Sequence, residues 1–239
     1  MIPKIIHFCW FGRGEMPELT LQCIESWHKV MPDWKYILWN EDNFDISSYP
    51  YAQEAYDAKK YAFVSDVARL YALEQQGGIY LDTDVLVYKP FEPLLNHAAF
   101  VGFEGSKHCP VGTCVIGSEI HGEWVSLQLA DYAGRHFILP GGEYDMTTNV
   151  SFITKKMIEK GFVSNGFEQD FHGLHVFPVD YFCPRHTTGA YIRTDNTYCE
   201  HLGIGSWADA KYGWRARFLS KLSPSFRVLI VKLKRMIFG

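Results

Sequence analysis

Residues 65–85 read SDVARLYALEQQGGIYLDTDV and combine a helix pattern with a strand pattern. In the first half, apolar residues recur at helical spacing, which places Asp66 and Arg69 one turn apart on the same edge of a helix. A glycine pair at 77–78 follows, and glycine tolerates the left-handed backbone that a helix C-terminus needs. Residues 79–81 then form a short apolar strand. The stretch therefore predicts a helix, a glycine turn and a buried strand that ends at two aspartates.

Asp82 and Asp84 stand at the end of this strand, separated by one residue. In a regular strand this spacing points both side chains to the same face. Two carboxylates there suit a divalent cation such as Mg²⁺ or Mn²⁺, which takes oxygen ligands and keeps positions open for water and phosphate. The alternative is a polar turn between strands at 79–81 and 85–88, because aspartate is common in turns.

The first half of the chain alternates strands and helices. Hydrophobic periodicity predicts strands at 2–11, 35–39 and 79–81, and helices at 19–30, 51–59 and 61–76. This order is typical of an α/β fold with a mostly parallel sheet that carries helices on its faces. Ligands gather at the carboxyl ends of strands in such sheets, so the loop at 12–14 is a candidate nucleotide contact.

The second half shows weaker periodicity. Strands are expected at 98–103 and 113–117, a helix at 121–135, a helix from 147 or 148 to about 160, and extended pieces between 176 and 183. Thr147 or Thr148 is suited to cap the second of these helices.

The run Ser-Asp-x-x-Arg, followed by Gly-Gly-Ile-Tyr-x-Asp-x-Asp, resembles the DXD-containing sugar transferases. This family groups the yeast Och1-type mannosyltransferases, the bacterial capsule and O-antigen transferases, and the glucosyltransferase domains of large clostridial toxins. Residues 2–12 look like the family's first strand. With His201 and Ser206-Trp207, the resemblance covers about residues 1–207.

This resemblance implies a GT-A type nucleotide-sugar-binding fold. It also implies a metal-dependent, retaining transfer of a hexose (galactose, glucose or an N-acetyl derivative) from a UDP-sugar to a saccharide acceptor. The setting expected from the bacterial branch is capsular polysaccharide or O-antigen synthesis, in which the acceptor is lipid-linked.

The resemblance further implies which residues form the site. The metal ligands would be Asp82, Asp84 and His201, with Mn²⁺ or Mg²⁺ as the ion, although the toxin branch has a carboxylate in place of the histidine. The catalytic residues would be Asp66, Arg69, Asp82 and Asp84. The donor-binding set would be Phe8, Trp10, Ser65, Asp66, Arg69, Gly78, Tyr80, Asp82, Thr83, Asn149, Ser206 and Trp207. The alternative for Asn149 and its polar neighbours Glu143, Asp145 and Thr148 is an ordinary helix-capping cluster.

A phosphatase of the haloacid-dehalogenase type is the second function class. Residues 79–85 also fit that fold's apolar strand followed by Asp-x-Asp, in which Asp82 would be the nucleophile and Asp84 a general acid. Such phosphatases need a downstream acidic pair spaced as Gly-Asp-x-x-x-Asp, and the sequence lacks one. The transferase is therefore the favoured interpretation.

The charge distribution separates a tail from the rest of the chain. The 239 residues carry a net charge of −4, yet residues 211–239 contain eight Lys or Arg and no Asp or Glu. Apolar residues recur at helical spacing among these cations, which is typical of a helix lying on an anionic membrane surface. The alternative is a helix packed on its own domain or on a second subunit. We expect one domain at 1–210 and a membrane-associating tail at 211–239. Nucleic acid is not expected as a partner, because no basic groove continues the tail's charge.

Cysteine usage and hydropathy predict the compartment. Six cysteines without Cys-x-x-Cys spacing favour reduced thiols. The N-terminus does not show a signal-peptide pattern, and no run of about eighteen apolar residues indicates a spanning helix. The expected location is therefore cytoplasmic, with peripheral association at the inner face of the cell membrane.

Overall fold

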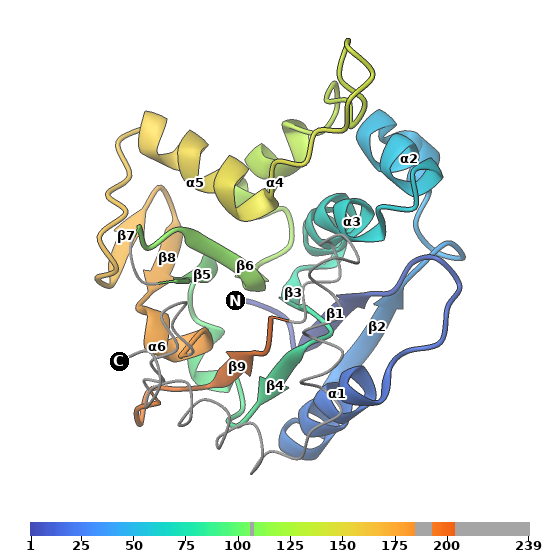
Figure 1. The fold of residues 1–239 in the computed structure, drawn as a ribbon. Helices are drawn as coiled ribbons and strands as arrows, with labels where there is room; N and C mark the ends of the chain where they lie inside the picture. The colour runs from blue at the N-terminus through green and yellow to red at the C-terminus, as the bar shows by residue number, and fades with distance from the viewer. Residues whose placement is uncertain (106–107, 185–192, 204–239) are drawn as a thin grey trace, which may run out of the picture. The chain divides into compact units, whose positions relative to one another are not determined.

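A computed structural model describes residues 1–105, 108–184 and 193–203 (Figure 1). Within these ranges, Met1–Leu202 form one compact unit. Ser206, Trp207 and the predicted tail at 211–239 lie outside the described residues. None of the helices in the described ranges is both long and apolar enough to cross a bilayer.

The unit is built on a mixed sheet that has seven strands in the described ranges. Their order is β2 (Lys35–Trp39), β1 (Ile5–Cys9), β3 (Gly78–Leu81), β6 (Val111–Ser118), β5 (Ala99–Phe103), β8 (Leu174–Phe177) and β7 (Gln169–Phe171). Five of these strands run in one direction, while β6 and β7 run against them. The prediction of a mostly parallel α/β sheet is confirmed.

A second, two-stranded sheet pairs β4 (Val85–Val87) with β9 (Cys199–His201) in antiparallel fashion. Because β4 begins just after the Asp-Thr-Asp segment, this small sheet brings the far end of the described chain beside the central motif (Figure 1).

Helices cover both faces of the large sheet and create two cores. On one face pack α2 (Pro50–Asp57), α3 (Tyr61–Gln76), α4 (Glu123–Ala130) and α5 (Asn149–Glu159), with Phe63 and Val67 of α3 fully or nearly fully buried.

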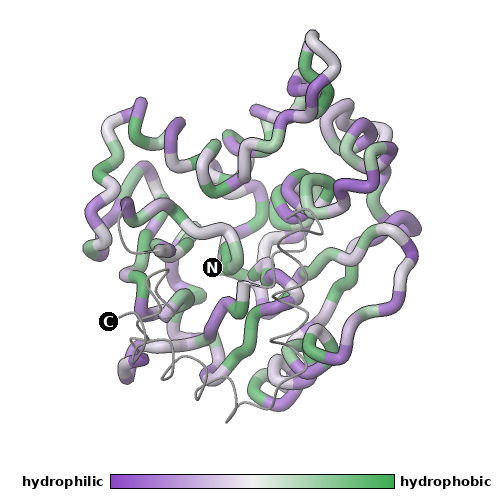
Figure 2. Tube along the Cα trace, in the orientation of Figure 1, coloured by the Kyte–Doolittle hydropathy of each residue, from purple (hydrophilic) through white to green (hydrophobic). Residues whose placement is uncertain are grey.

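 On the other face pack α1 (Glu18–Val30), α6 (Val179–Phe182) and the small sheet, around Trp27 and Val85. Along the tube in Figure 2, these helices alternate between hydrophobic and hydrophilic positions, as expected for helices with one buried side.

The glycine pair behaves as the sequence predicts. Gly77 ends α3 with φ of 60°, and its N–H donates to the carbonyl of Leu73 at 2.8 Å. Gly78 begins β3 with φ of 107°, and a Cβ there would lie 2.6 Å from the carbonyl oxygen of Ile5. Both positions therefore need glycine, the first for its turn and the second also for the close approach of β1.

The second half departs from the prediction in three places. Residues 179–182 form α6 and are not extended, because Pro178 starts a helical turn there that packs Phe182 into the core. The predicted helix at 121–135 is shorter and spans Glu123–Ala130. Strands β7 and β9 have no counterpart in the prediction, since three-residue strands carry too little periodicity to detect.

Candidate functional site

Asp82 and Asp84 occupy a turn that joins β3 to β4. The N–H of Val85 donates to the carbonyl of Asp82 at 3.0 Å, and Thr83 lies half-buried at the tip of this turn. The sequence argument that a regular strand aligns the two carboxylates is therefore wrong in its geometry. The turn nevertheless holds both aspartates near each other at the carboxyl end of β3.

His201 joins these aspartates through the small sheet. It pairs with Val85 in the register of β4 and β9, and the next N–H, of Leu202, donates to the carbonyl of Asp84 at 3.0 Å. The His201 Nε2 lies 3.3 Å from Asp84 Oδ1. One ligand atom from each of Asp82, Asp84 and His201 lies within 4.8 Å of the other two. The three side chains predicted as metal ligands therefore converge.

This group is chemically suited to a divalent cation. Two carboxylates and one imidazole match Mn²⁺ better than Mg²⁺, which prefers oxygen ligands alone. The side chains are 24%, 14% and 26% exposed for Asp82, Asp84 and His201, so further ligands can reach an ion from solvent. Burial alone would lower the pKa of His201, but Cys114 and Asp84 raise the pKa well above its ordinary value. The surroundings of His201 therefore stabilise a positive charge at this position.

Arg69 is buried beside the carboxylates and is hydrogen-bonded on every side. Its Nη2 lies 2.9 Å from Asp66 Oδ1 and 3.4 Å from Asp82 Oδ1. Its Nη1 donates to the carbonyl of Thr113 at 2.9 Å, and its Nε donates to the carbonyl of Ser65 at 3.1 Å. Because these contacts engage the guanidinium within the protein, Arg69 is placed to orient Asp66 and Asp82.

Tyr80 completes the support of Asp82. Its ring lies under the guanidinium of Arg69, 4.6 Å from centroid to Cζ, and its hydroxyl donates to Asp82 Oδ1 at 2.8 Å. The Tyr80 side chain is buried in the core, so it acts on a ligand through Asp82. Asp82 is thus held by an arginine and a tyrosine before any ion binds.

Asp66 borders the site on the side that faces the second half of the chain. Burial raises its pKa to about 6, although the neighbouring Arg69 opposes this rise and Asp82 adds to it. Asn149, at the start of α5, also lies beside Asp66 and favours its charged form. The Tyr132 hydroxyl lies 3.3 Å from Asn149 Oδ1. The structure therefore brings together Ser65, Asp66, Arg69 and Asn149, four of the residues that the family resemblance implies for donor binding.

The polar cluster before α5 has a partly structural role. Thr148 caps the helix by accepting a hydrogen bond from the N–H of Ser151 at 3.3 Å. Asp145 forms an ion pair with Arg135 at 2.7 Å. The capping alternative therefore holds for Thr148, while Asn149 turns toward Asp66.

Three other predicted donor contacts, Phe8, Gly78 and Trp10, have packing, backbone or hydrogen-bonding partners within the protein. Phe8 is buried in the core against Trp27, at a ring-centroid distance of 5.4 Å. Gly78 begins β3 and so lies at the opposite end of that strand from Asp82. Trp10 follows β1, and its indole N–H donates to the carbonyl of Gly14 at 2.6 Å. The roles of Phe8 and Gly78 in this structure are packing and backbone geometry.

Glu104 is a site residue that the sequence interpretation missed. It directly follows β5, and burial raises its pKa, with His201, Asp82 and Arg69 as the charged groups that act on it. Thr113, on β6, was likewise missed although it accepts two hydrogen bonds from Arg69. The rule that ligand groups gather at the carboxyl ends of strands, applied to the predicted strand at 98–103, would have pointed to Glu104.

Comparisons with known proteins agree with the motif. Residues 17–101 match the family described as "Glycosyltransferase sugar-binding region containing DXD motif". Inositol phosphoceramide mannosyltransferase 3 of Schizosaccharomyces pombe is 38% identical over 104 residues, which are 42% of this chain and 29% of that protein. Mannosyl phosphorylinositol ceramide synthase SUR1 of Saccharomyces cerevisiae is 32% identical over 124 residues, 49% of this chain and 31% of that protein.

Among solved structures, the PaToxG glycosyltransferase aligns with a TM-score of 0.46 and 20% identity, covering 54% of this chain and 59% of that chain. The galactosyltransferase LgtC, solved with donor and acceptor sugar analogues, aligns with a TM-score of 0.44 and 14% identity over 93% of this chain and 99% of that chain.

The matched family is a glycosyltransferase family, and it gives no support to the phosphatase alternative. These fungal relatives are named for sphingolipid mannosylation, so they give no support to a capsule or O-antigen setting. This chain spans about a third of the length of the curated relatives it matches. Residues 17–101, which include the buried Arg69 and the Asp82–Asp84 turn, are thus similar to the sugar-binding region of the DXD-containing glycosyltransferases.

Proposed function

We propose that this chain is a metal-dependent glycosyltransferase that moves a hexose from a nucleotide-diphosphate sugar to a saccharide acceptor. The observation that carries the proposal is the convergence of Asp82, Asp84 and His201 beside the buried Arg69. Mn²⁺, or Mg²⁺, held by the three side chains would supply positive charge that stabilises the diphosphate as it leaves the sugar.

The remaining residues have roles that follow from their contacts. Arg69 and Tyr80 hold Asp82 in place, because both contact its Oδ1 atom. Asp66 accepts hydrogen bonds from hydroxyl groups of the donor, since a carboxylate is an acceptor with several lone pairs. Burial raises the pKa of Asp66, and the neighbouring Asn149 opposes part of that rise. No protein nucleophile is needed if the acceptor attacks the same face from which the diphosphate departs, as the family resemblance implies for a retaining enzyme.

The donor belongs to the hexose class. A UDP-sugar follows from the resemblance to the bacterial branch, and mannose joins galactose and glucose because the fungal relatives are named mannosyltransferases. The same names describe a lipid as the acceptor, which supports a lipid-linked acceptor for this chain.

The predicted location is also part of the proposal. The basic tail at 211–239 would hold the enzyme at an anionic membrane surface on the cytoplasmic side, where a lipid-linked acceptor is presented.

A donor-hydrolysis screen tests the proposed activity. The purified chain is incubated with UDP- and GDP-hexoses, with and without Mn²⁺, and release of the nucleoside diphosphate is measured. We expect Asp84→Ala to abolish the Mn²⁺-dependent release, because a small cation loses one of its few protein ligands. Asp33→Ala, at an exposed position in the turn before β2, is the control and should keep full activity.

Two results would contradict the proposal. The first is Mn²⁺-dependent release that survives in Asp84→Ala, which would place the metal elsewhere. The second is hydrolysis of p-nitrophenyl phosphate, with no donor consumed, which would favour the phosphatase. Proton NMR of the product reads whether the anomeric configuration is retained.

A further inference from the structure

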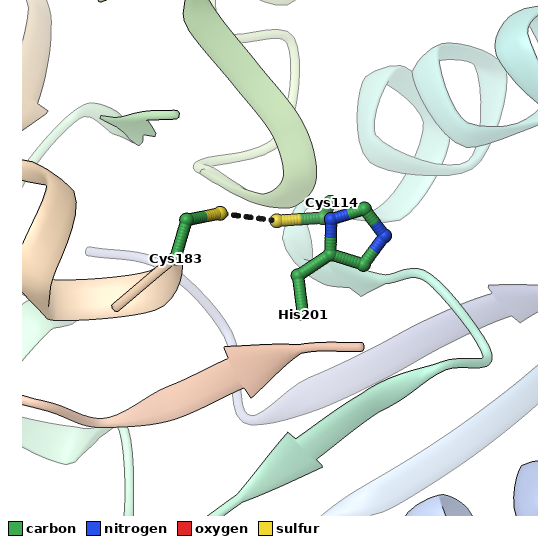
Figure 3. A group of neighbouring side chains, drawn as sticks. All are labelled: Cys114, Cys183 and His201. Atoms are coloured by element: carbon green, nitrogen blue, oxygen red, sulfur yellow. Dashed lines mark hydrogen bonds between the residues drawn. The ribbon is translucent and has the colours of Figure 1, made fainter. Parts of the chain in front are cut away.

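A second group of metal-binding side chains adjoins the carboxylates. Cys114 lies on β6, Cys183 directly follows α6, and His201 ends β9. The two sulfur atoms are 3.4 Å apart, and both cysteines are free thiols. One ligand atom from each of the three residues lies within 4.8 Å of the other two. Figure 3 shows the two sulfurs pointing toward each other with the imidazole beside Cys114.

The chemistry of this group differs from that of the aspartates. Thiolates are soft ligands that select Zn²⁺ over Mn²⁺ or Mg²⁺, and two cysteines with one histidine form a known type of open zinc site. Tetrahedral Zn–S bonds of about 2.3 Å separate two sulfur ligands by roughly 3.7 Å. The sulfurs of Cys114 and Cys183 are within a few tenths of an ångström of that separation. The two sulfurs therefore need to move apart by only a few tenths of an ångström to bind one ion.

His201 belongs to both groups. Its Nε2 lies 3.3 Å from Asp84 Oδ1, and in Figure 3 the other ring nitrogen is the one on the side of Cys114. A neutral imidazole offers one lone pair to a metal and keeps a proton on the second nitrogen. A metal bound through Nδ1 leaves an Nε2–H that donates to Asp84. This is the carboxylate–histidine–metal arrangement that fixes a ligating imidazole.

We infer that Cys114, Cys183 and His201 form a binding site for Zn²⁺, and that Zn²⁺ there withdraws His201 from the Asp82–Asp84 metal centre. Binding forms two Zn–S bonds and one Zn–N bond, and the two thiol protons and the Nδ1 proton of His201 pass to solvent. A water molecule fills the fourth position. The competition for His201 rests on the proposed function, whereas binding of Zn²⁺ by the thiols does not.

The charge of the metal stabilises the two thiolates once they coordinate it. The His201 side chain is 26% exposed, so an ion can reach the group from the side that also serves the carboxylates. Zinc would thus act as an inhibitor whose site is inside the donor-binding region.

Cobalt spectroscopy tests the thiol site without any enzymatic assay. Co²⁺ is added to the reduced, untagged full chain, and thiolate-to-cobalt charge transfer is followed in the near ultraviolet. We expect the band in the wild type and in the control Cys109→Ala, whose half-buried thiol lies outside the group. The band should fall by half or more in Cys183→Ala, and one equivalent of Zn²⁺ should abolish it in the wild type. A wild type without the band, or a band unchanged in Cys183→Ala, overturns the zinc site.

Electron paramagnetic resonance of Mn²⁺ tests the shared histidine. We expect one equivalent of Zn²⁺ to weaken Mn²⁺ binding at least tenfold in the wild type and in Cys109→Ala, but much less in Cys183→Ala. Mn²⁺ binding that is unaffected by Zn²⁺ in the wild type overturns the competition. A chain that shows the cobalt band but binds no Mn²⁺ overturns the proposed metal centre and leaves the zinc site standing.

Discussion

Asp66→Asn should make the protein more stable and less active. Asp66 is a buried carboxyl whose pKa is raised by burial from its ordinary 3.8 to about 6, and this value already includes the attraction of Arg69 at 2.9 Å. The rise corresponds to about 3 kcal/mol between the charged and neutral forms. Asparagine has the shape of the neutral acid and carries no charge that must be buried.

The sign of the pH dependence follows from this pKa. Below pH 3.8 the carboxyl is protonated in both the folded and unfolded chain, so the stability associated with the raised pKa is fully present. As the pH rises through about 6, the folded protein must ionise a buried group and that stability is lost. The variant should therefore match the wild type near pH 4 and exceed it by about 3 kcal/mol near pH 8.

Urea unfolding between pH 4 and 8, followed by tryptophan fluorescence, measures this difference. Asp145→Asn is the matched control, because hydrogen bonds from Arg135 and Thr147 outweigh burial and lower the pKa of Asp145. That variant should lose stability at neutral pH and approach the wild type as the pH falls. The reasoning is refuted if Asp66→Asn is less stable than the wild type at pH 8, or if the difference between them does not change with pH.

The other predictions concern Arg69, Gly78 and the tail. Arg69→Lys keeps the charge but loses the planar guanidinium group. The protein should lose about 2 kcal/mol of unfolding free energy in urea and most donor turnover, while its Mn²⁺ affinity changes less. Unchanged turnover would contradict the role of Arg69 in donor use. Gly78→Ala should lower the unfolding free energy by at least about 2 kcal/mol, because its φ is 107° and its Cβ would meet β1. Gly14→Ala, which meets nothing within 4 Å, is its control and should be nearly neutral. A chain ending at residue 210 should no longer float with anionic liposomes, and equal flotation of both chains would assign the tail to packing or subunit contact.

The first half of the fold is predictable from the sequence because its signals are local. The strand at 35–39 and the helix at 61–76 are found with the predicted bounds, and the glycine pair ends the helix as expected. Each of these elements is long enough to show its period or has a residue type that ends it. The pairing of β9 with β4 depends on contacts between residues more than a hundred positions apart, and no local pattern records them.

The same difference between local and long-range signals applies to the residues of the site. The sequence points to Asp66, Arg69, Asp82 and Asp84 because they share one short motif, and it reaches His201 only through family resemblance. Glu104 and Thr113 enter the site from strands that carry no motif of their own. Phe8 lies next to a motif residue yet packs in the core, since the alternation of β1 turns it away from the face that holds Cys9.

Strand β6 fixes the relative position of everything at the site. Two consecutive residues on it face opposite sides of the sheet: Thr113 holds Arg69, while the Cys114 thiol lies beside His201. The carbonyl of Cys114 also accepts the N–H of Asp82 at 2.9 Å. An insertion or deletion of one residue within 111–118 would exchange the two faces and detach Arg69, Asp82 and His201 together. Changes in length should therefore be tolerated better in the loops outside β6, and engineering of this chain should leave that strand at its native length.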